Sequence, residues 1–264
     1  MDLQLKNKCA FVSGSTGGIG LAIAKVLASE GAEVILNGRT QARIDQAIVR
    51  LNSEVPGAKL RGIPADFADP ASVESLLDKL GFVDILINNV GIFTSQSFAD
   101  TSDADWYRMF EVNVMSGVRL SRAVLPGMLK RNWGRILFVS SECAMLVPED
   151  LIAYSTTKAA LLAVSRGLAQ TTKGSAVTVN SVLPGSTLSE GAERFLKTVA
   201  ENEQISEKEV AENFFKNVRT SSLIQRFTST EEIANTLAYL CSPLSSATNG
   251  AAIKLEGGSV PGIL

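Results

Sequence analysis

Apolar residues along the chain alternate between short continuous runs and positions spaced as on one face of a helix. The first run is followed at once by a glycine-rich turn and then by apolar residues at helical spacing, and this order repeats along the chain. Strands are predicted at residues 9–13, 34–36, 60–65, 83–87, 135–140, 177–183 and 251–255. Because they are apolar on both faces and alternate with helices, they predict an α/β fold, a doubly wound parallel sheet with helices on both faces.

The helices between these strands are marked by apolar stripes and end signals. Helices are predicted over residues 19–27, 44–51, 102–131 and 154–171, and after Asp69 and Ser229. Asp69 is expected to cap a helix whose first residue is Pro70, and Ser229 with Glu232 forms a capping-box signature. No repeat or low-complexity linker interrupts the pattern, so residues 1–264 predict a single domain.

Residues 186–225, called the flap below, differ from the rest of the chain. They are rich in Glu, Lys, Asn and Ser, carry Phe195, Phe214 and Phe215, and show no strand pattern. We interpret them as an inserted helical segment. Ligands of open α/β sheets bind outside the carboxyl ends of the strands, and the flap follows one such end. It is expected to cover that crevice, to contribute to substrate binding and to be mobile until ligands bind.

Composition excludes several classes of function. The chain has 25 Lys+Arg against 27 Asp+Glu, so no basic field exists to hold nucleic acid or an anionic membrane. It has no His, which removes Ser-His-Asp and Cys-His nucleophiles, His-ligated zinc and any imidazole base. Cys9, Cys143 and Cys241 are far apart without metal-binding or disulfide spacing, so no metal is expected and buried thiols in a reducing compartment are favoured.

The chain shows no targeting or membrane signal. Its first eight residues lack the apolar core of a signal peptide, and the longest uncharged stretch, residues 233–253, is broken by Asn, Ser, Thr, Pro and Gly. A cytoplasmic location is expected.

The glycine-rich turn, SGSTGGIG at residues 13–20, joins the first strand to the first helix. Such a turn lets a pyrophosphate reach the positive end of a helix, although its spacing departs from GxGxxG and a plain tight turn stays open. The second strand ends in Gly38-Arg39, with no carboxylate, where an acidic residue favours a free ribose 2′-hydroxyl and Arg a 2′-phosphate. NADP is therefore expected over NAD, unless Arg39 is only a solvated start to the next helix.

Tyr154 and Lys158 lie four residues apart, on one face of a predicted helix. A cation about 4–6 Å away would lower the pKa of the phenol from about 10, so that Tyr154 could replace the missing His as acid and base. By itself this spacing is common on helix surfaces.

Taken together, these motifs resemble the short-chain dehydrogenase/reductase family over essentially the whole chain. The turn matches TGxxxGxG with Ser13 for Thr, residues 88–91 match NNAG with Val for Ala, and Tyr154 and Lys158 match YxxxK. Ser141 and Asn113 occupy the places of the remaining two catalytic residues. Pro184-Gly185 matches a PG motif, and residues 256–258 resemble a closing DGG. The 3-oxoacyl carrier-protein reductase branch is the most similar in size and C-terminal pattern.

The resemblance implies a Rossmann-type fold and a role for each matching residue. Tyr154 would be the acid in reduction and the base in oxidation, Ser141 would stabilise charge on the substrate oxygen, and Asn113 would anchor a proton-relaying water. Lys158 would lower the pKa of Tyr154 and hold the nicotinamide ribose. The implied cofactor-binding residues are Gly14, Ser15, Thr16, Gly18, Ile19, Gly20, Arg39, Asp66, Asn89, Gly91, Tyr154, Lys158, Pro184, Gly185 and Thr187.

Several assignments keep alternatives. Ser140 could take the place of Ser141, Asn113 could only cap or kink its helix, and Asp66 could only initiate a turn. Gly17 stands where many NADP-using relatives carry a basic residue, which leaves Arg39 as the only evident phosphate ligand. The segment after Gly185 is shorter to its first Thr than PGxxxT. Which hydroxyl meets the carboxamide of the nicotinamide therefore stays open, and Thr187 is one choice among several.

The expected function is an NADP(H)-dependent oxidoreductase acting on a carbonyl or secondary alcohol. The alternative is a catalytically silent dinucleotide-binding regulator, a class that usually breaks the catalytic tetrad. Glu142, Cys143 and residues 145–147, with Phe93, Thr187 and the flap, suggest a mostly apolar pocket wall, although residues 145–147 could equally be ordinary packing. The three phenylalanines of the flap favour an apolar ketone, sterol or fatty acyl group over a free sugar. The resemblance alone implies a homotetramer.

Overall fold

The computed structural model describes residues 1–263, which form a seven-stranded parallel sheet in the order β3-β2-β1-β4-β5-β6-β9. The strands are β1 Cys9–Val12, β2 Glu33–Gly38, β3 Lys59–Pro64, β4 Ile85–Asn88, β5 Gly134–Val139, β6 Val177–Pro184 and β9 Ala252–Leu255. The order reverses between β1 and β4. This doubly wound α/β fold confirms the class predicted from the pattern.

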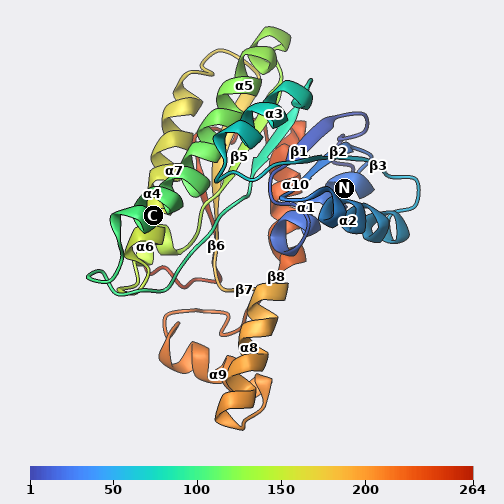
Figure 1. The fold of residues 1–264 in the computed structure, drawn as a ribbon. Coiled ribbons are helices and arrows are strands. Elements are labelled where there is room, and N and C mark those ends of the chain that lie inside the picture. Colours follow the sequence, from blue (N-terminus) through green and yellow to red (C-terminus); the bar gives the residue numbers. More distant parts are fainter. Residues whose placement is uncertain (264) are drawn as a thin grey trace.

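Helices cover both faces of the sheet (Figure 1). On one face lie α1 Gly18–Ser29, α2 Gln41–Glu54 and α10 Thr230–Cys241, and on the other α3 Pro70–Leu80, α4 Asp103–Phe110, α5 Ser116–Arg131 and α7 Ile152–Gln170. Each face has its own apolar core. Leu27 of α1 and Leu237 of α10 pack in the first core, and Leu120 of α5 and Leu161 of α7 pack in the second.

The predicted helix starts are confirmed in detail. The Asp69 side chain accepts a hydrogen bond from the N–H of Ala71, with Pro70 as the first helical residue. Ser229 and Glu232 form the complete reciprocal capping box of α10. These local interactions fix where α3 and α10 begin, and therefore where the loop that follows β3 at its carboxyl end stops.

The helix predicted over residues 102–131 contains a feature that the pattern does not reveal. One turn, Glu111–Met115, is π-helical and separates α4 from α5. Asn113 lies in this turn, and its amide accepts from the N–H of Ile92 at 2.7 Å and donates to the Ile92 carbonyl at 2.9 Å. Such wide turns often occur at functional sites. This one directs the Asn113 side chain toward the segment that follows β4.

The flap contains α8 Glu190–Glu203 and α9 Glu207–Asn217, which Figure 1 shows in orange, projecting away from the sheet. Its base is not purely helical, because β7 Thr187–Leu188 pairs with β8 Thr228–Ser229. Phe214 and Phe215 pack with Phe227, at ring-centroid distances of 5.2 and 5.1 Å, so much of their apolar surface is covered within this lobe. Phe195 remains exposed.

Within residues 1–263, no helix combines the length and apolar character needed to cross a membrane.

Candidate active site

The glycine-rich turn between β1 and α1 is packed too tightly for side chains at key positions. Gly14 has a φ of 62°, and a Cβ on Gly20 would lie 2.4 Å from the Gly14 carbonyl oxygen and 2.6 Å from the Asn89 amide nitrogen. The Asn89 amide donates to the carbonyls of Ser13 and Gly14, at 2.9 and 3.1 Å. Its side chain therefore fixes the shape of the turn.

Two further side chains support the same turn from within the core. The Ser15 hydroxyl donates to the Val12 carbonyl at 2.8 Å and accepts from the N–H of Asn37 at 2.9 Å. The Asn37 side-chain oxygen accepts from the N–H of Gly14 at 3.0 Å. Ser15, predicted to bind cofactor, is fully buried, so its hydroxyl shapes the turn from within.

The turn ends at the N-terminus of α1, which has no side-chain cap. Gly17 is the N-cap residue, and the first turn, with Gly18 and Ile19, holds no acidic side chain. Free N–H groups and the positive end of the helix dipole suit an anion. These residues fit the pyrophosphate of a dinucleotide.

Beside this turn lies a hollow of about 280 Å³. Thr16, Arg39, Asp66 and Gly91 line it, as predicted for cofactor-binding residues, but so do two arginines that the pattern does not single out. The full lining is Gly14, Thr16, Asn37, Gly38, Arg39, Arg43, Ala65, Asp66, Phe67, Ala68, Val90, Gly91, Ile92, Arg108 and Val112. Its three guanidinium groups suit a phosphorylated ribose.

Gly38 at the end of β2 leaves the hollow without a carboxylate at this position. A Cβ there would lie 2.5 Å from the Thr16 methyl carbon, so a carboxylate-bearing side chain at this position would collide with the glycine-rich turn. The Asp66 carboxylate accepts from the N–H of Ala68 at 3.0 Å, which supports its local turn while it lines the hollow.

Tyr154 and Lys158 project from α7 toward the segments that follow β4 and β5. The Lys158 ammonium donates to the Val139 carbonyl at 2.9 Å and lies 5.6 Å from the centroid of the Tyr154 ring. A Cβ on Gly91 would lie 3.2 Å from this ammonium, so the glycine gives it room. The Asn113 amide also donates to the Thr157 hydroxyl at 2.9 Å, which links the π-helical turn to α7.

Ser141 is the serine that faces the phenol. The Ser141 hydroxyl lowers the pKa of the Tyr154 phenol and so opposes the effect of burial. The Ser141 oxygen also accepts from the N–H of Cys143 at 3.2 Å. The hydroxyl of the alternative residue, Ser140, is buried and donates to the Lys158 carbonyl at 2.8 Å, so Ser140 supports α7.

Burial controls the pKa values of this group. Desolvation raises the pKa of Tyr154 above its ordinary value, with smaller upward contributions from Cys143 and Glu142. Desolvation also lowers the pKa of Lys158 to about 8. The expectation that Lys158 lowers the pKa of Tyr154 is wrong for this structure, because the ammonium is directed at the Val139 carbonyl and burial dominates the pKa of the phenol.

A family profile described as short chain dehydrogenase matches residues 8–200 of the chain. The chain belongs to the short-chain dehydrogenase family. The uncharacterised oxidoreductase YvaG of Bacillus subtilis is 44% identical over 260 residues, which cover 98% of each chain. The 3-oxoacyl-[acyl-carrier-protein] reductase FabG of Aquifex aeolicus is 32% identical over 262 residues, covering 98% of this chain and 99% of the relative. The resemblance to the reductase branch is thereby confirmed.

A solved structure of similar shape is that of L-sorbose reductase from Gluconobacter frateurii, complexed with NADPH and L-sorbose. It is 31% identical to this chain, with a TM-score of 0.93 and complete coverage of both chains, 100% each. The chain is therefore a short-chain oxidoreductase with the fold of a reductase that binds NADPH.

In this short-chain dehydrogenase, the segment after β6 does not direct the hydroxyl of Thr187, the expected cofactor-binding residue, toward the glycine-rich turn. Thr187 has its side-chain oxygen 2.9 Å from the Gly185 carbonyl and 3.0 Å from the Thr228 hydroxyl, so it closes the β7–β8 pair. Ser189 instead lies over the glycine-rich turn, with 3.6 Å between its Cβ and a Cβ built on Gly18. The signal was present in the sequence, because Ser189 follows Pro184 at the spacing of PGxxxT with Ser for Thr.

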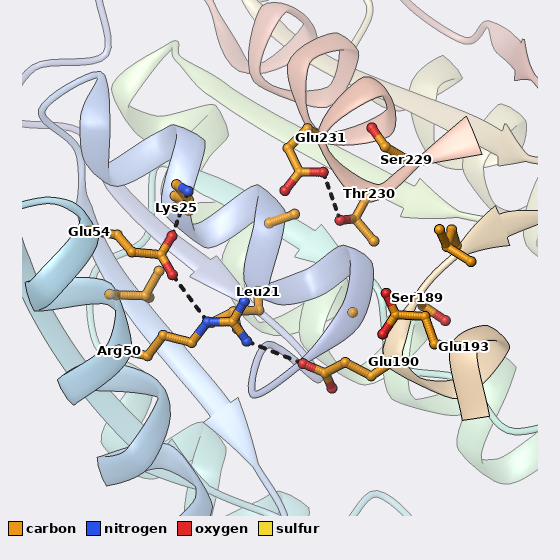
Figure 2. Close-up of a pocket in the computed structure, with 14 residues that line it drawn as sticks. Leu21, Lys25, Arg50, Glu54, Ser189, Glu190, Glu193, Ser229, Thr230 and Glu231 are labelled. Atoms are coloured by element: carbon orange, nitrogen blue, oxygen red, sulfur yellow. Dashed lines mark hydrogen bonds and ion pairs between the residues drawn. The ribbon is translucent and has the colours of Figure 1, made fainter. Parts of the chain in front are cut away.

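The start of the flap also lies against the glycine-rich turn and pairs with α2, and Figure 2 shows the ion pair of Arg50 and Glu190. Arg50 of α2 pairs with Glu190 at 3.3 Å, and the other Glu190 oxygen lies 2.7 Å from a Cβ built on Gly17. The carboxylate thus fills the space that a side chain at Gly17 would use. A pocket of about 470 Å³ opens beside this contact, between α1, α2, α8 and α10. Sequence reasoning missed both members of this exposed pair.

Proposed function

We propose that this short-chain dehydrogenase transfers a hydride between NADP(H) and a carbonyl or secondary alcohol, with Tyr154 as the acid and base. The observation that carries the proposal is the phenol of Tyr154 beside the Ser141 hydroxyl, with the Lys158 ammonium 5.6 Å from its ring centroid, together with an uncapped helix N-terminus at the end of the glycine-rich turn. The nicotinamide, when bound, supplies or accepts the hydride. A catalytically silent regulator would not need Tyr154, Ser141 and Lys158 to lie next to one another.

The chain's own residues would bind the cofactor, stabilise charge on the substrate oxygen and transfer the proton. Gly18 and Ile19 would present backbone N–H groups to the pyrophosphate, and Arg39, Arg43 and Arg108 would surround the ribose phosphate. Ser141 would donate to the substrate oxygen as charge develops there. Burial keeps the phenol of Tyr154 protonated at neutral pH, which suits proton donation during reduction. Lys158 would hold the nicotinamide ribose, and Asn113 would anchor the water of a proton relay.

Two substrate classes deserve assay. The half-exposed apolar side chains Met145 and Val147, and Phe93 with its ring 5.8 Å from that of Tyr154, favour an apolar ketone or acyl fragment. Likeness to the L-sorbose reductase favours a polyhydroxylated ketone. Oxidation of NADPH in the presence of a panel of both kinds tests the proposal. An enzyme that consumes no NADPH with any carbonyl compound would contradict it.

Arg39→Ala should remove most of a preference for NADPH over NADH. A charge-assisted contact contributes about 1.5–3 kcal/mol, or about 10- to 150-fold in affinity. Dissociation constants of both cofactors, measured by fluorescence titration, check this. Arg43→Ala serves as a comparison, since Arg43 lines the same hollow and should share part of the effect. Equal affinities of the unmodified protein for NADPH and NADH would contradict the cofactor assignment.

The flap is proposed to close over the crevice when ligands bind. It leaves the sheet through the two-residue strand β7, and its helices have a small core of their own around Leu196, Ala200 and Val210. Such a lobe can open as a unit. Hydrogen exchange in α8 and α9 should therefore slow when NADPH and a substrate analogue are added. Equal, strong protection with and without ligand would show a fixed lobe.

A cytoplasmic location and a homotetrameric assembly remain predictions from composition and from family resemblance.

A further inference from the structure

A buried ion pair joins the flap to the turn that carries Ser141. Glu142 follows Ser141 directly, and its carboxylate accepts from the Arg219 guanidinium at 2.8 Å. The side chains are 3% and 14% exposed, against 30% to 86% for all but one of the other pairs found within residues 1–263. Arg219 lies just after α9, 77 positions after Glu142 in the sequence. This pair therefore connects two parts of the site that only the tertiary structure brings together.

The turn that carries Ser141 and Glu142 is called the catalytic turn below. Within it, further contacts hold the Glu142 carboxylate in place. The same oxygen accepts from the Ser186 hydroxyl at 3.3 Å, and the Glu142 N–H donates to the Pro184 carbonyl at 2.9 Å. The second oxygen has no hydrogen-bond partner and packs against Gly185, where a Cβ would lie 2.9 Å away. A side chain at Gly185 would therefore displace the carboxylate.

On the flap side, α9 places Arg219, whose backbone N–H donates to the Phe214 carbonyl at 3.0 Å. Its guanidinium carbon lies 5.7 Å from the centroid of Phe214, which packs in turn against Phe227. Arg219 also lies near the thiol of Cys143, the residue after Glu142.

We propose that the Glu142–Arg219 pair, called the clasp below, positions Ser141 for catalysis by tying the catalytic turn to the segment that follows α9. A buried carboxylate that loses its cation has a large desolvation penalty, which lowers stability, and the catalytic turn also loses its link to the segment after α9. The productive geometry of the Ser141 hydroxyl then depends on this link. Glu142 and Arg219 are positioning residues in this scheme, which rests on the proposed function only in that Ser141 and Tyr154 act on the substrate.

The clasp also has an electrostatic consequence for Tyr154. The groups that face the phenol are Ser141, Glu142 and Cys143 from the catalytic turn, and Lys158 from α7. The Glu142 charge raises the pKa of Tyr154, and the Arg219 cation compensates for that charge. Opening the clasp should therefore disfavour the phenolate needed in alcohol oxidation.

The test compares Arg219→Met with the double variant Glu142→Gln/Arg219→Met and with Arg226→Met. Arg226 is a matched control, because it pairs with Glu232 on the exposed surface near the end of the flap. We expect Arg219→Met to lower kcat by about 10- to 100-fold, as a misplaced catalytic group does, and to leave NADPH affinity unchanged. It should also lower the urea midpoint and move the pH profile of alcohol oxidation upward. Arg226→Met should behave as the unmodified enzyme in all four measurements.

The double variant separates positioning from folding. Without the buried unpaired charge, its urea midpoint should return toward that of the unmodified protein, and its pH profile should move back down. Its kcat should stay low, because the ion pair no longer ties the catalytic turn to the segment after α9. Recovery of kcat together with the midpoint would overturn the proposal and leave a purely structural pair, as would an unchanged kcat in Arg219→Met. An unmodified protein that oxidises no NADPH with any carbonyl compound would instead overturn the proposed function, and the clasp with it.

Discussion

Replacing Tyr154 with Phe is expected to lower turnover by about 10²- to 10⁴-fold, the range that a positioned general acid contributes. The phenol is the proposed proton donor to the substrate oxygen, and the chain has no His that could take its place. The ring itself should still pack against Phe93, so NADPH affinity should remain unchanged. Steady-state oxidation of NADPH with a verified substrate measures the first effect, and fluorescence titration measures the second.

Tyr239→Phe is the matched control for this substitution. Tyr239 is a half-exposed residue on α10, outside the catalytic group, and loses the same hydroxyl. Its turnover should equal that of the unmodified enzyme. If Tyr154→Phe kept more than a few per cent of the activity, another acid would have to protonate the substrate, and the proposed role of Tyr154 would fail.

Lys158→Met is expected to stop turnover and to change how stability depends on pH. Burial lowers the folded-state pKa of Lys158 to about 8, from its ordinary value of 10.5. This difference corresponds to a penalty of about 3 kcal/mol in folding stability for burying the charged ammonium. Below both values the ammonium is charged in the folded and unfolded states, and the full penalty of burying it is present. Between them the unfolded chain binds more protons, so stability of the unmodified protein rises with pH.

The Met variant should lack this rise, because it has no ammonium to bury. Urea unfolding of both proteins at about pH 7 and about pH 10 measures the difference. Lys173→Met, at an exposed position, should keep the pH dependence of the unmodified protein. Parallel pH dependence in Lys158→Met and the unmodified protein would contradict the assignment. The same variant should also weaken NADPH binding, since the ammonium is expected to hold the nicotinamide ribose.

Much of the fold follows from local patterns in the sequence. The buried strand Ile85–Asn88, the cap formed by Asp69 and Pro70, and the capping box of Ser229 are each encoded within a few residues. Hydrophobic period and hydrogen bonding to the nearest turn of backbone determine such features, so they can be predicted without knowing what packs against them. The glycine-rich turn and the spacing of Tyr154 and Lys158 are local in the same sense.

The electrostatics of the candidate site could not be predicted in this way. The spacing of Tyr154 and Lys158 predicts a lowered phenol pKa, whereas the structure directs the ammonium to Val139 and raises the pKa of the phenol by burial. Burial depends on every element packed around a group and is not encoded by its neighbours in the sequence. The π-helical turn at Asn113 has the same origin, since its partners are Ile92 and Thr157.

By itself, the sequence determined the order of strands and helices, the glycine-rich turn and the residues able to perform proton transfer. Only the tertiary structure decided which distant side chains complete the site: Ser189 over the turn, Arg43 and Arg108 beside Arg39, and Arg219 on Glu142. The physical reason is that helical and strand periodicity fix the face on which a residue lies. Its partner across a loop or a flap is fixed by packing, which no short pattern in the sequence records.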